Sequence, residues 1–251
     1  MIKKSLTLLA VSIVSSATFA AEGNTALANL GLSFSGSAAI TSDYRFRGLT
    51  QTQSDPAIQG SFTLEHTSGL YFSAFASNVE FGSAAHLELD PQIGYATPLK
   101  LGSIEPTLDV GVVYYNYPSE SDINWAEFYG KLTFDDVFTN GDSLLTNINY
   151  TSEYGGSNSD GWNVNLGYSF PFADSGFGGV AGLGYSKVDD FDFGDGSDDY
   201  IDWKVGVDYS VKSIDGLTAE LAAVGTNIDG LSGAAKRGVE TGAVFTLTKA
   251  F

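Results

Sequence analysis

The chain has 251 residues, with 12 basic and 30 acidic side chains and a formal net charge of −18. We expect no nucleic-acid partner, because phosphate recognition requires basic patches. Cysteine is absent from the sequence, which excludes a disulfide framework and any thiolate metal site. Thirty glycines stand beside 17 phenylalanines and 13 tyrosines, a composition that suits a twisted sheet with aromatic bands better than a water-soluble enzyme.

The first residues have the pattern of a secretory signal peptide. Lys3 and Lys4 precede an apolar segment at 6–14, and Ala17-Thr18-Phe19-Ala20 places small residues at positions −3 and −1 of a cut after residue 20. This apolar segment is shorter than the roughly 20 residues that a membrane-spanning helix needs. We therefore expect residues 1–20 to direct secretion across the inner membrane and to be cleaved, which leaves 21–251 as the mature chain.

Apolar and polar residues alternate with a period of two along most of the mature chain. Residues 162–170 (WNVNLGYSF) and 200–211 (YIDWKVGVDYSV) show this most clearly, and the pattern predicts strands whose two faces lie in different environments. Turn sequences such as Asn140-Gly141 and Asp215-Gly216 separate the segments. The predicted strands are 33–47, 56–66, 69–79, 86–97, 103–117, 123–134, 143–154, 161–170, 177–188, 199–211, 217–227 and 238–251. The parity of 69–79 and 177–188 is ambiguous, which leaves ten or fourteen strands open beside twelve.

A membrane barrel explains this alternation better than a soluble β-sandwich, although both alternate. No later apolar segment is long enough for a spanning helix, so this chain can enter a membrane only as a closed barrel. Aromatic residues near the strand ends resemble interfacial girdles. They are Tyr44, Phe46, Tyr114, Phe128, Phe134, Tyr154, Trp162, Phe170, Trp203 and Tyr209.

The even strand number places both termini at the periplasmic side, with short turns there. The longest gaps, 189–198 and 228–237, then lie outside. No gap is long enough for a large internal plug.

The last predicted strand ends on an aromatic residue. Val239, Ala243, Phe245, Leu247 and Phe251 share one of its faces. A final strand that closes with Phe resembles the assembly signal of outer-membrane barrels. We therefore expect Phe251 to be read by the barrel-assembly machinery, and the folded protein to contact outer-membrane lipid and lipopolysaccharide.

Strand parity directs more acids than bases into the lumen. Arg45 and Arg47 alternate with aromatic residues that we expect to face lipid, so the two arginines should point inward and form a constriction, or pair with Asp43 or Glu65. The inward acids are Asp43, Glu65, Glu88, Asp90, Asp109, Glu127, Glu153, Asp202, Asp208, Glu220 and Glu240, and the inward bases are Arg45, Arg47, Lys131 and Lys204. The candidates for lumen selectivity are Arg45, Arg47, Glu88, Asp90, Glu127, Lys131, Asp202 and Lys204. The acidic excess predicts a preference for cations.

Enzymatic and metal-binding interpretations have weaker support. His66 and His86 should lie at opposite rims of an apolar band about 25 Å tall, so they cannot share a catalytic site. Asp190, Asp192 and Asp195 are weak calcium candidates, but Asp195 stands where an EF-hand needs glycine and no Glu closes the loop. We therefore expect a solvated outer loop there, no metal, no cofactor and no enzymatic activity.

A more specific pattern runs through residues 42–79. The segments SDYRFRGLTQT (42–52), DPAIQG (55–60), SGLY (68–71) and SNV (77–79) resemble the N-terminal signature of the TorF family of outer-membrane porins. Weaker similarity continues over nearly the whole mature chain. The resemblance implies an outer-membrane porin without catalytic residues, and it does not name the transported solute.

These observations predict a closed antiparallel barrel of about twelve strands that passes ions or small hydrophilic solutes by passive diffusion. A non-conducting structural or surface-interaction barrel stays open as the alternative, favoured if side chains such as Trp125 and Tyr129 pack the lumen shut. The sequence also allows a homo-oligomer.

Overall fold

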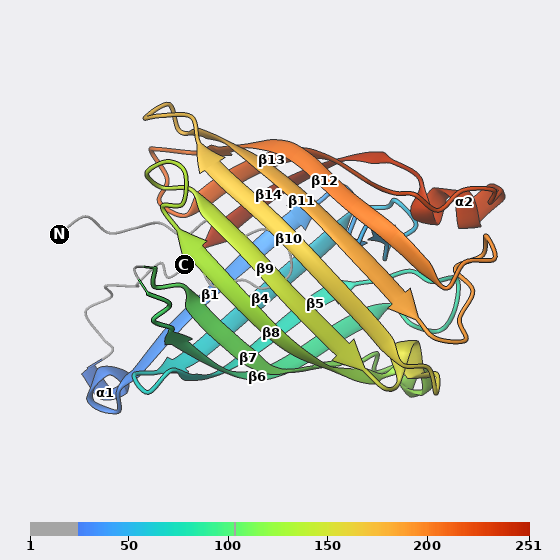
Figure 1. Ribbon diagram of the computed structural model, residues 1–251, viewed down its shortest axis with the longest axis horizontal. Coiled ribbons are helices and arrows are strands. Elements are labelled where there is room, and N and C mark those ends of the chain that lie inside the picture. Colours follow the sequence, from blue (N-terminus) through green and yellow to red (C-terminus); the bar gives the residue numbers. More distant parts are fainter. Residues whose placement is uncertain (1–24, 103) are drawn as a thin grey trace.

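The computed structural model describes residues 25–102 and 104–251, and it shows a closed antiparallel barrel (Figure 1). Consecutive wall strands pair with each other, and the first pairs with the last to close the ring. The wall strands are β1 (Leu32–Thr41), β4 (Ala57–His66), β5 (Leu70–Asn78), β6 (Leu87–Pro98), β7 (Thr107–Tyr115), β8 (Trp125–Asp135), β9 (Ser143–Thr151), β10 (Gly161–Pro171), β11 (Phe177–Val188), β12 (Asp199–Ser210), β13 (Leu217–Thr226) and β14 (Gly242–Ala250). The predicted twelve-stranded barrel is confirmed. The predicted signal peptide lies outside the described residues.

Short and long connections lie at opposite ends of the barrel (Figure 1). The end where β1 begins and β14 finishes, called here the turn end, carries α1 (Thr25–Asn29) and short links such as 67–69. The other end, called the loop end, carries the long connections 42–56 and 227–241, together with η1 (Ser121–Ile123), η2 (Tyr154–Gly156) and α2 (Gly233–Val239). Within the described residues, no helix is both long and apolar enough to span a membrane.

The wall separates an apolar exterior from a polar interior. Ile58, on an outward position of β4, is 72% exposed, whereas the inward Glu127 of β8 is 2% exposed. The outward side chains of the other strands are also large and apolar, as at Phe128, Trp162 and Val205. A water-soluble protein would bury these groups, so this surface fits lipid.

The first predicted strand is too long, and this is the main correction to the sequence analysis. β1 ends at Thr41, and residues 42–56 leave the wall and fold inward, with β2 (Arg45–Phe46) and β3 (Leu49–Thr50) pairing only with each other. Tyr44, expected to face lipid, is 4% exposed and belongs to an interior aromatic cluster with Phe46 at its edge. Alternation with period two is the same for a strand in the wall and a strand inside it, so the pattern could not separate them. No gap between the predicted strands is long enough for a large internal plug, but the segment that folds inward begins inside the predicted strand 33–47.

Three further expectations fail because the loop-end connections are structured. The last predicted strand begins only at Gly242, and the preceding residues form α2, whose Val239 is buried with Tyr200 and Ile228 instead of facing outward. Glu153 and Glu240, expected in the lumen, are exposed residues of loop-end connections. Tyr154, expected in a girdle, packs on Trp125 with ring centroids 5.2 Å apart.

The seam that closes the barrel depends on the final residue. β1 pairs with β4 along its whole length but with β14 only from Ser37 to Thr41. Phe251 extends this short ladder, because its N–H donates to the Gly36 carbonyl and its own carbonyl accepts from the Gly36 N–H, both at 2.9 Å. A Cβ on Gly36 would lie 2.9 Å from Cε2 of Phe251, so the ring covers this glycine directly.

Deleting Phe251 should therefore reduce assembly of the barrel. The loss removes two backbone hydrogen bonds from the shortest ladder of the barrel wall and uncovers the edge of β1. The measurement is the fraction of outer-membrane protein whose gel mobility changes on heating, since a closed barrel resists detergent until heated. Ser232→Ala, in the loop before α2, is the control, and equal assembly of both variants would refute the role of the last residue.

Candidate functional site: a hairpin inside the barrel

Residues 42–56, called here the lumen hairpin, turn back on themselves inside the barrel. β2 and β3 are joined by Arg47 and Gly48, whose φ angles of 49° and 79° are both positive. A two-residue turn with two positive φ angles is a common way to close a hairpin. At the tip, a Cβ on Gly48 would lie 2.6 Å from Cγ2 of Thr226 and 2.9 Å from Cβ of Asp202. The hairpin that leaves β1 therefore touches the wall at β12 and β13.

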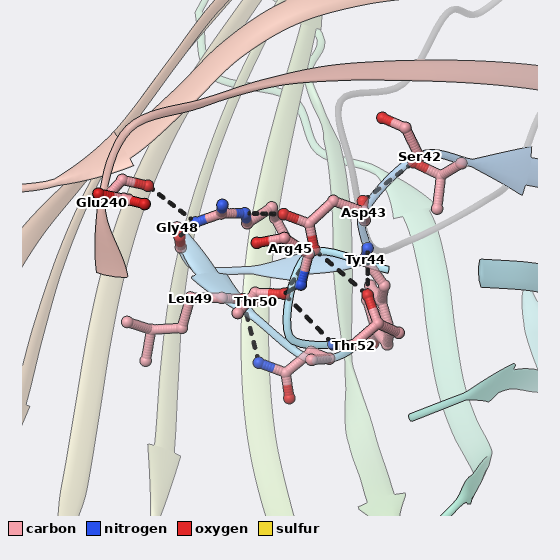
Figure 2. A network of polar contacts seen from close by, with 12 residues as sticks. Ser42, Asp43, Tyr44, Arg45, Gly48, Leu49, Thr50, Thr52 and Glu240 are labelled. Carbon is pink, nitrogen blue, oxygen red and sulfur yellow. Dashed lines mark hydrogen bonds and ion pairs between the residues drawn. The ribbon is translucent and has the colours of Figure 1, made fainter. Parts of the chain in front are cut away.

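The carboxylate of Asp43 organises the hairpin (Figure 2). It accepts hydrogen bonds from Nε of Arg45 and from Oγ1 of Thr50, both at 2.5 Å, and from Oγ1 of Thr52 at 3.2 Å. Nη1 of Arg45 then donates to the carbonyls of Gly48 at 3.0 Å and Glu240 at 3.1 Å. Asp43 thus fixes the shape of the hairpin, and Arg45 ties it to the segment before β14.

Arg47 links the tip of the hairpin to β8. Its Nη2 donates to Oε1 of Glu127 at 2.6 Å, and the two side chains are 11% and 3% exposed. Its guanidinium also lies 4.6 Å from the centroid of the Phe46 ring. Burial is the largest single effect and would lower the pKa of Arg47, but the charge and hydrogen bond of Glu127, together with nearby Tyr115 and Tyr200, hold this pKa above its ordinary value. Arg47 is therefore a permanent cation in contact with a wall acid.

Aromatic packing fills the space between the hairpin and the strands β5–β8. Phe46 meets Tyr115 with ring centroids 5.5 Å apart, and Tyr115 stacks on Trp125 at 4.3 Å. The buried members of this cluster are Tyr44, Ala57, Val79, Ala85, Tyr115, Tyr117 and Trp125. Leu49 packs on the other side, against the cluster of Tyr200, Ile228 and Val239. The hairpin is thus held from both sides at the loop end of the lumen.

The remaining selectivity candidates lie on inward positions of three wall strands. Glu88 and Asp90 are on β6, Glu127 and Lys131 on β8, and Asp202 and Lys204 on β12. Arg45 and Arg47 also lie inside, but they come from the hairpin and not from the wall. The structure brings Arg47 to Glu127, while Arg45 meets Asp43, one of the two pairings that the sequence left open.

Every inward base has an acidic partner. Besides the two hairpin arginines, Nζ of Lys131 lies 3.5 Å from Oδ2 of Asp109, and Nζ of Lys204 lies 2.6 Å from Oε1 of Glu220. Among the described residues, five inward acids have no Lys or Arg within salt-bridge distance. They are Glu65, Glu88, Asp90, Asp202 and Asp208. The lumen therefore keeps an excess of negative charge after its ion pairs are counted.

A second polar cluster, formed by inward residues of β5–β8, could not be predicted from the sequence. The hydroxyls of Tyr71 and Tyr129 are 2.5 Å apart, Tyr71 donates to Oδ1 of Asp109 at 2.8 Å, and Gln92 donates to the Tyr129 hydroxyl at 2.5 Å. Parity alone signals that these residues point inward, and it does not signal their contact. They line β5–β8 below the hairpin, beside Lys131.

The weak calcium candidates do not converge. Asp192 accepts the N–H groups of Gly194 and Gly196, and Asp195 accepts that of Ser197, so these carboxylates shape their own loop. In the part of the chain that the structure describes, no group of three or more His, Cys, Asp or Glu side chains is placed to hold a metal ion. His66 ends β4 at the turn end and His86 precedes β6 at the loop end, as expected.

A closed antiparallel barrel with a polar interior and an apolar exterior has the architecture of transmembrane β-barrels. The chain belongs to the Gcw_chp family, described as bacterial proteins of unknown function, which matches residues 25–251. Among solved structures it is similar to the NanC porin, with a TM-score of 0.56 and 11% identity over 87% of this chain and 98% of that one. It is also similar to the KdgM porin, with a TM-score of 0.52 and 9% identity over 86% and 98%. Identities this low show the fold alone, and no curated protein matches the sequence.

Replacing Arg47 by Met should destabilise the barrel by about 3 kcal/mol, because Glu127 would stay buried without its cation. The measurement is the free energy of unfolding from urea titrations of the heat-modifiable form. Replacing Lys236, whose pair with Glu240 is exposed, is the control and should have little effect.

The double variant Arg47→Met, Glu127→Met should recover much of the lost stability, since no uncompensated charge is left. If the single and double variants are equally stable, the ion pair does not hold the hairpin.

Proposed function

We propose that this protein is an outer-membrane channel for the passive diffusion of small hydrophilic solutes, with a preference for cations. The observation that carries the proposal is the charge left in the lumen after pairing. Each inward base is matched by an acid, and five further acids face the interior. Rings of Asp and Glu favour cations in channels.

The dimensions of a small barrel strengthen this effect. Wall charges act over roughly 8 Å at physiological salt, so a permeating ion inside so narrow a lumen stays within reach of the wall. Arg47 could reverse the cation preference expected from the excess of acids, because an unpaired arginine at the narrowest point of the lumen would select anions. Its contact with Glu127 offsets that charge, and Arg45 is offset by Asp43 in the same way.

The cellular setting of the proposal comes from sequence patterns and from the fold. The apolar exterior supports contact with outer-membrane lipid and lipopolysaccharide, and the expected partner in assembly is the barrel-assembly machinery. A cleaved signal peptide at 1–20, the resemblance to TorF porins and a homo-oligomer belong to the proposal as well. No enzymatic activity forms part of it.

One observation favours a second candidate, a non-conducting structural or surface-interaction barrel. Trp125 is 5% and Tyr129 is 7% exposed, and both pack inside the lumen. Planar-bilayer recording separates the two candidates. Discrete conductance steps from the purified, heat-modifiable barrel support the channel, and silence from the same material supports the closed barrel.

The selectivity prediction concerns two acids without a basic partner. Replacing Asp202 and Asp208 by Asn should lower the cation preference, because it removes two lumen acids that have no basic partner among the described residues. The measurement is the reversal potential across a bilayer in a salt gradient. Replacing Asp190 and Asp195, which lie in the 189–198 loop, serves as the charge-matched control and should leave the potential nearly unchanged. A wild-type channel that selects anions would overturn the charge argument.

A further inference from the structure

Two acids lie side by side in the wall behind the hairpin. Glu88 and Asp90 occupy successive inward positions of β6, so their side chains are neighbours on one face of the wall, and they are 2% and 4% exposed. Neither has a Lys or Arg within salt-bridge distance among the described residues. Buried carboxylates without a compensating positive charge are strongly unfavourable. Either a bound cation or a proton has to balance the charge of this pair.

The surroundings of the pair consist of oxygen donors and aromatic rings. The Tyr117 hydroxyl donates to Oε1 of Glu88 at 3.3 Å, and Tyr44 of the lumen hairpin belongs to the same buried cluster as Tyr117. The Asn116 N–H donates to Oδ1 of Asp90 at 3.3 Å. The second oxygen of Glu88, Oε2, is buried and accepts no N–H or O–H group of the residues that the structure describes. Buried polar atoms nearly always have a partner, so this bare oxygen indicates a missing one.

We propose that Glu88 and Asp90 bind a divalent, oxygen-preferring cation such as Ca²⁺ between the barrel wall and the lumen hairpin. Two carboxylates match a charge of +2, and calcium takes carboxylate, carbonyl and water oxygens in flexible geometry. The bare Oε2 of Glu88 supplies the first ligand. Because Tyr44 of the hairpin packs in the same buried cluster as Tyr117, a cation bound beside Glu88 also joins the hairpin to β6.

Cation binding at Glu88 and Asp90 can be tested without any measurement of conductance. The purified barrel in detergent is freed of metal with a chelator and titrated with Tb³⁺, a calcium substitute whose emission is sensitised by nearby tyrosine and tryptophan. Tyr44, Tyr117 and Trp125 provide these rings at the site. The native protein should show a saturable emission phase that Ca²⁺ displaces.

The double variant Glu88→Gln, Asp90→Asn should lose this phase, because it keeps the side-chain shapes and removes both charges. The matched control, Glu65→Gln, removes another inward acid without a basic partner, at the turn end of β4, and should retain it. Heat-modifiable mobility shows that each variant is folded. As a second measurement, Ca²⁺ should raise the temperature at which the native barrel loses its folded mobility, and should not do so for the Glu88/Asp90 variant.

Equal emission from the native protein and the Glu88/Asp90 variant would overturn the inference, because the bound ions would then sit on other acids. So would a native titration without a saturable phase, since the pair would then be balanced by a proton. A silent bilayer recording would count against the proposed channel and would leave this result unchanged.

Discussion

The need to pair every backbone N–H and C=O within lipid is the constraint from which the rest of this structure follows. Twelve strands meet it by closing on themselves, with the short seam between β1 and β14 completed by the backbone of Phe251. Closure sends alternate side chains outward and inward. The outward set is apolar, and the inward set includes buried acids such as Glu127 and Asp202. The polar interior is therefore a consequence of the wall, and the lumen hairpin is the additional element that shapes it.

The hairpin and the wall balance each other's charge. Asp43 offsets Arg45 within the hairpin, and Arg47 at its tip meets Glu127 of the wall. Aromatic packing on one side and Leu49 on the other hold this arrangement at the loop end. What is left is an acidic lumen narrowed by the hairpin. The wall presents an acid for its arginine, and Gly48 at the tip has no side chain to collide with Thr226 and Asp202 of the wall.

The wall could be predicted from the sequence, whereas the contents of the lumen could not. Period-two alternation is imposed by the two faces of the wall, so it predicted the strand number and directed Glu88, Asp90 and Asp202 inward. The same alternation in Tyr44-Arg45-Phe46-Arg47 belongs to a hairpin that has left the wall, and nothing in the period distinguishes the two. Gly48 was the available signal of a turn, but its partner Arg47 is not a residue that usually adopts a positive φ. Pairings across the lumen, such as Arg47 with Glu127, depend on the position of the hairpin. They cannot be predicted until that position is known.

The central claim, that residues 42–56 lie inside the barrel against β12, can be tested with a disulfide. The sequence contains no cysteine, so the variant Gly48→Cys, Asp202→Cys introduces a single pair. Their Cβ atoms would start 2.9 Å apart, and a small shift gives disulfide geometry. We predict that mild oxidation cross-links this pair in the folded, heat-modifiable barrel and does not cross-link Gly48→Cys with Ser35→Cys, which lies toward the turn end of β1. A folded barrel in which the Gly48–Asp202 pair stays reduced would contradict the account.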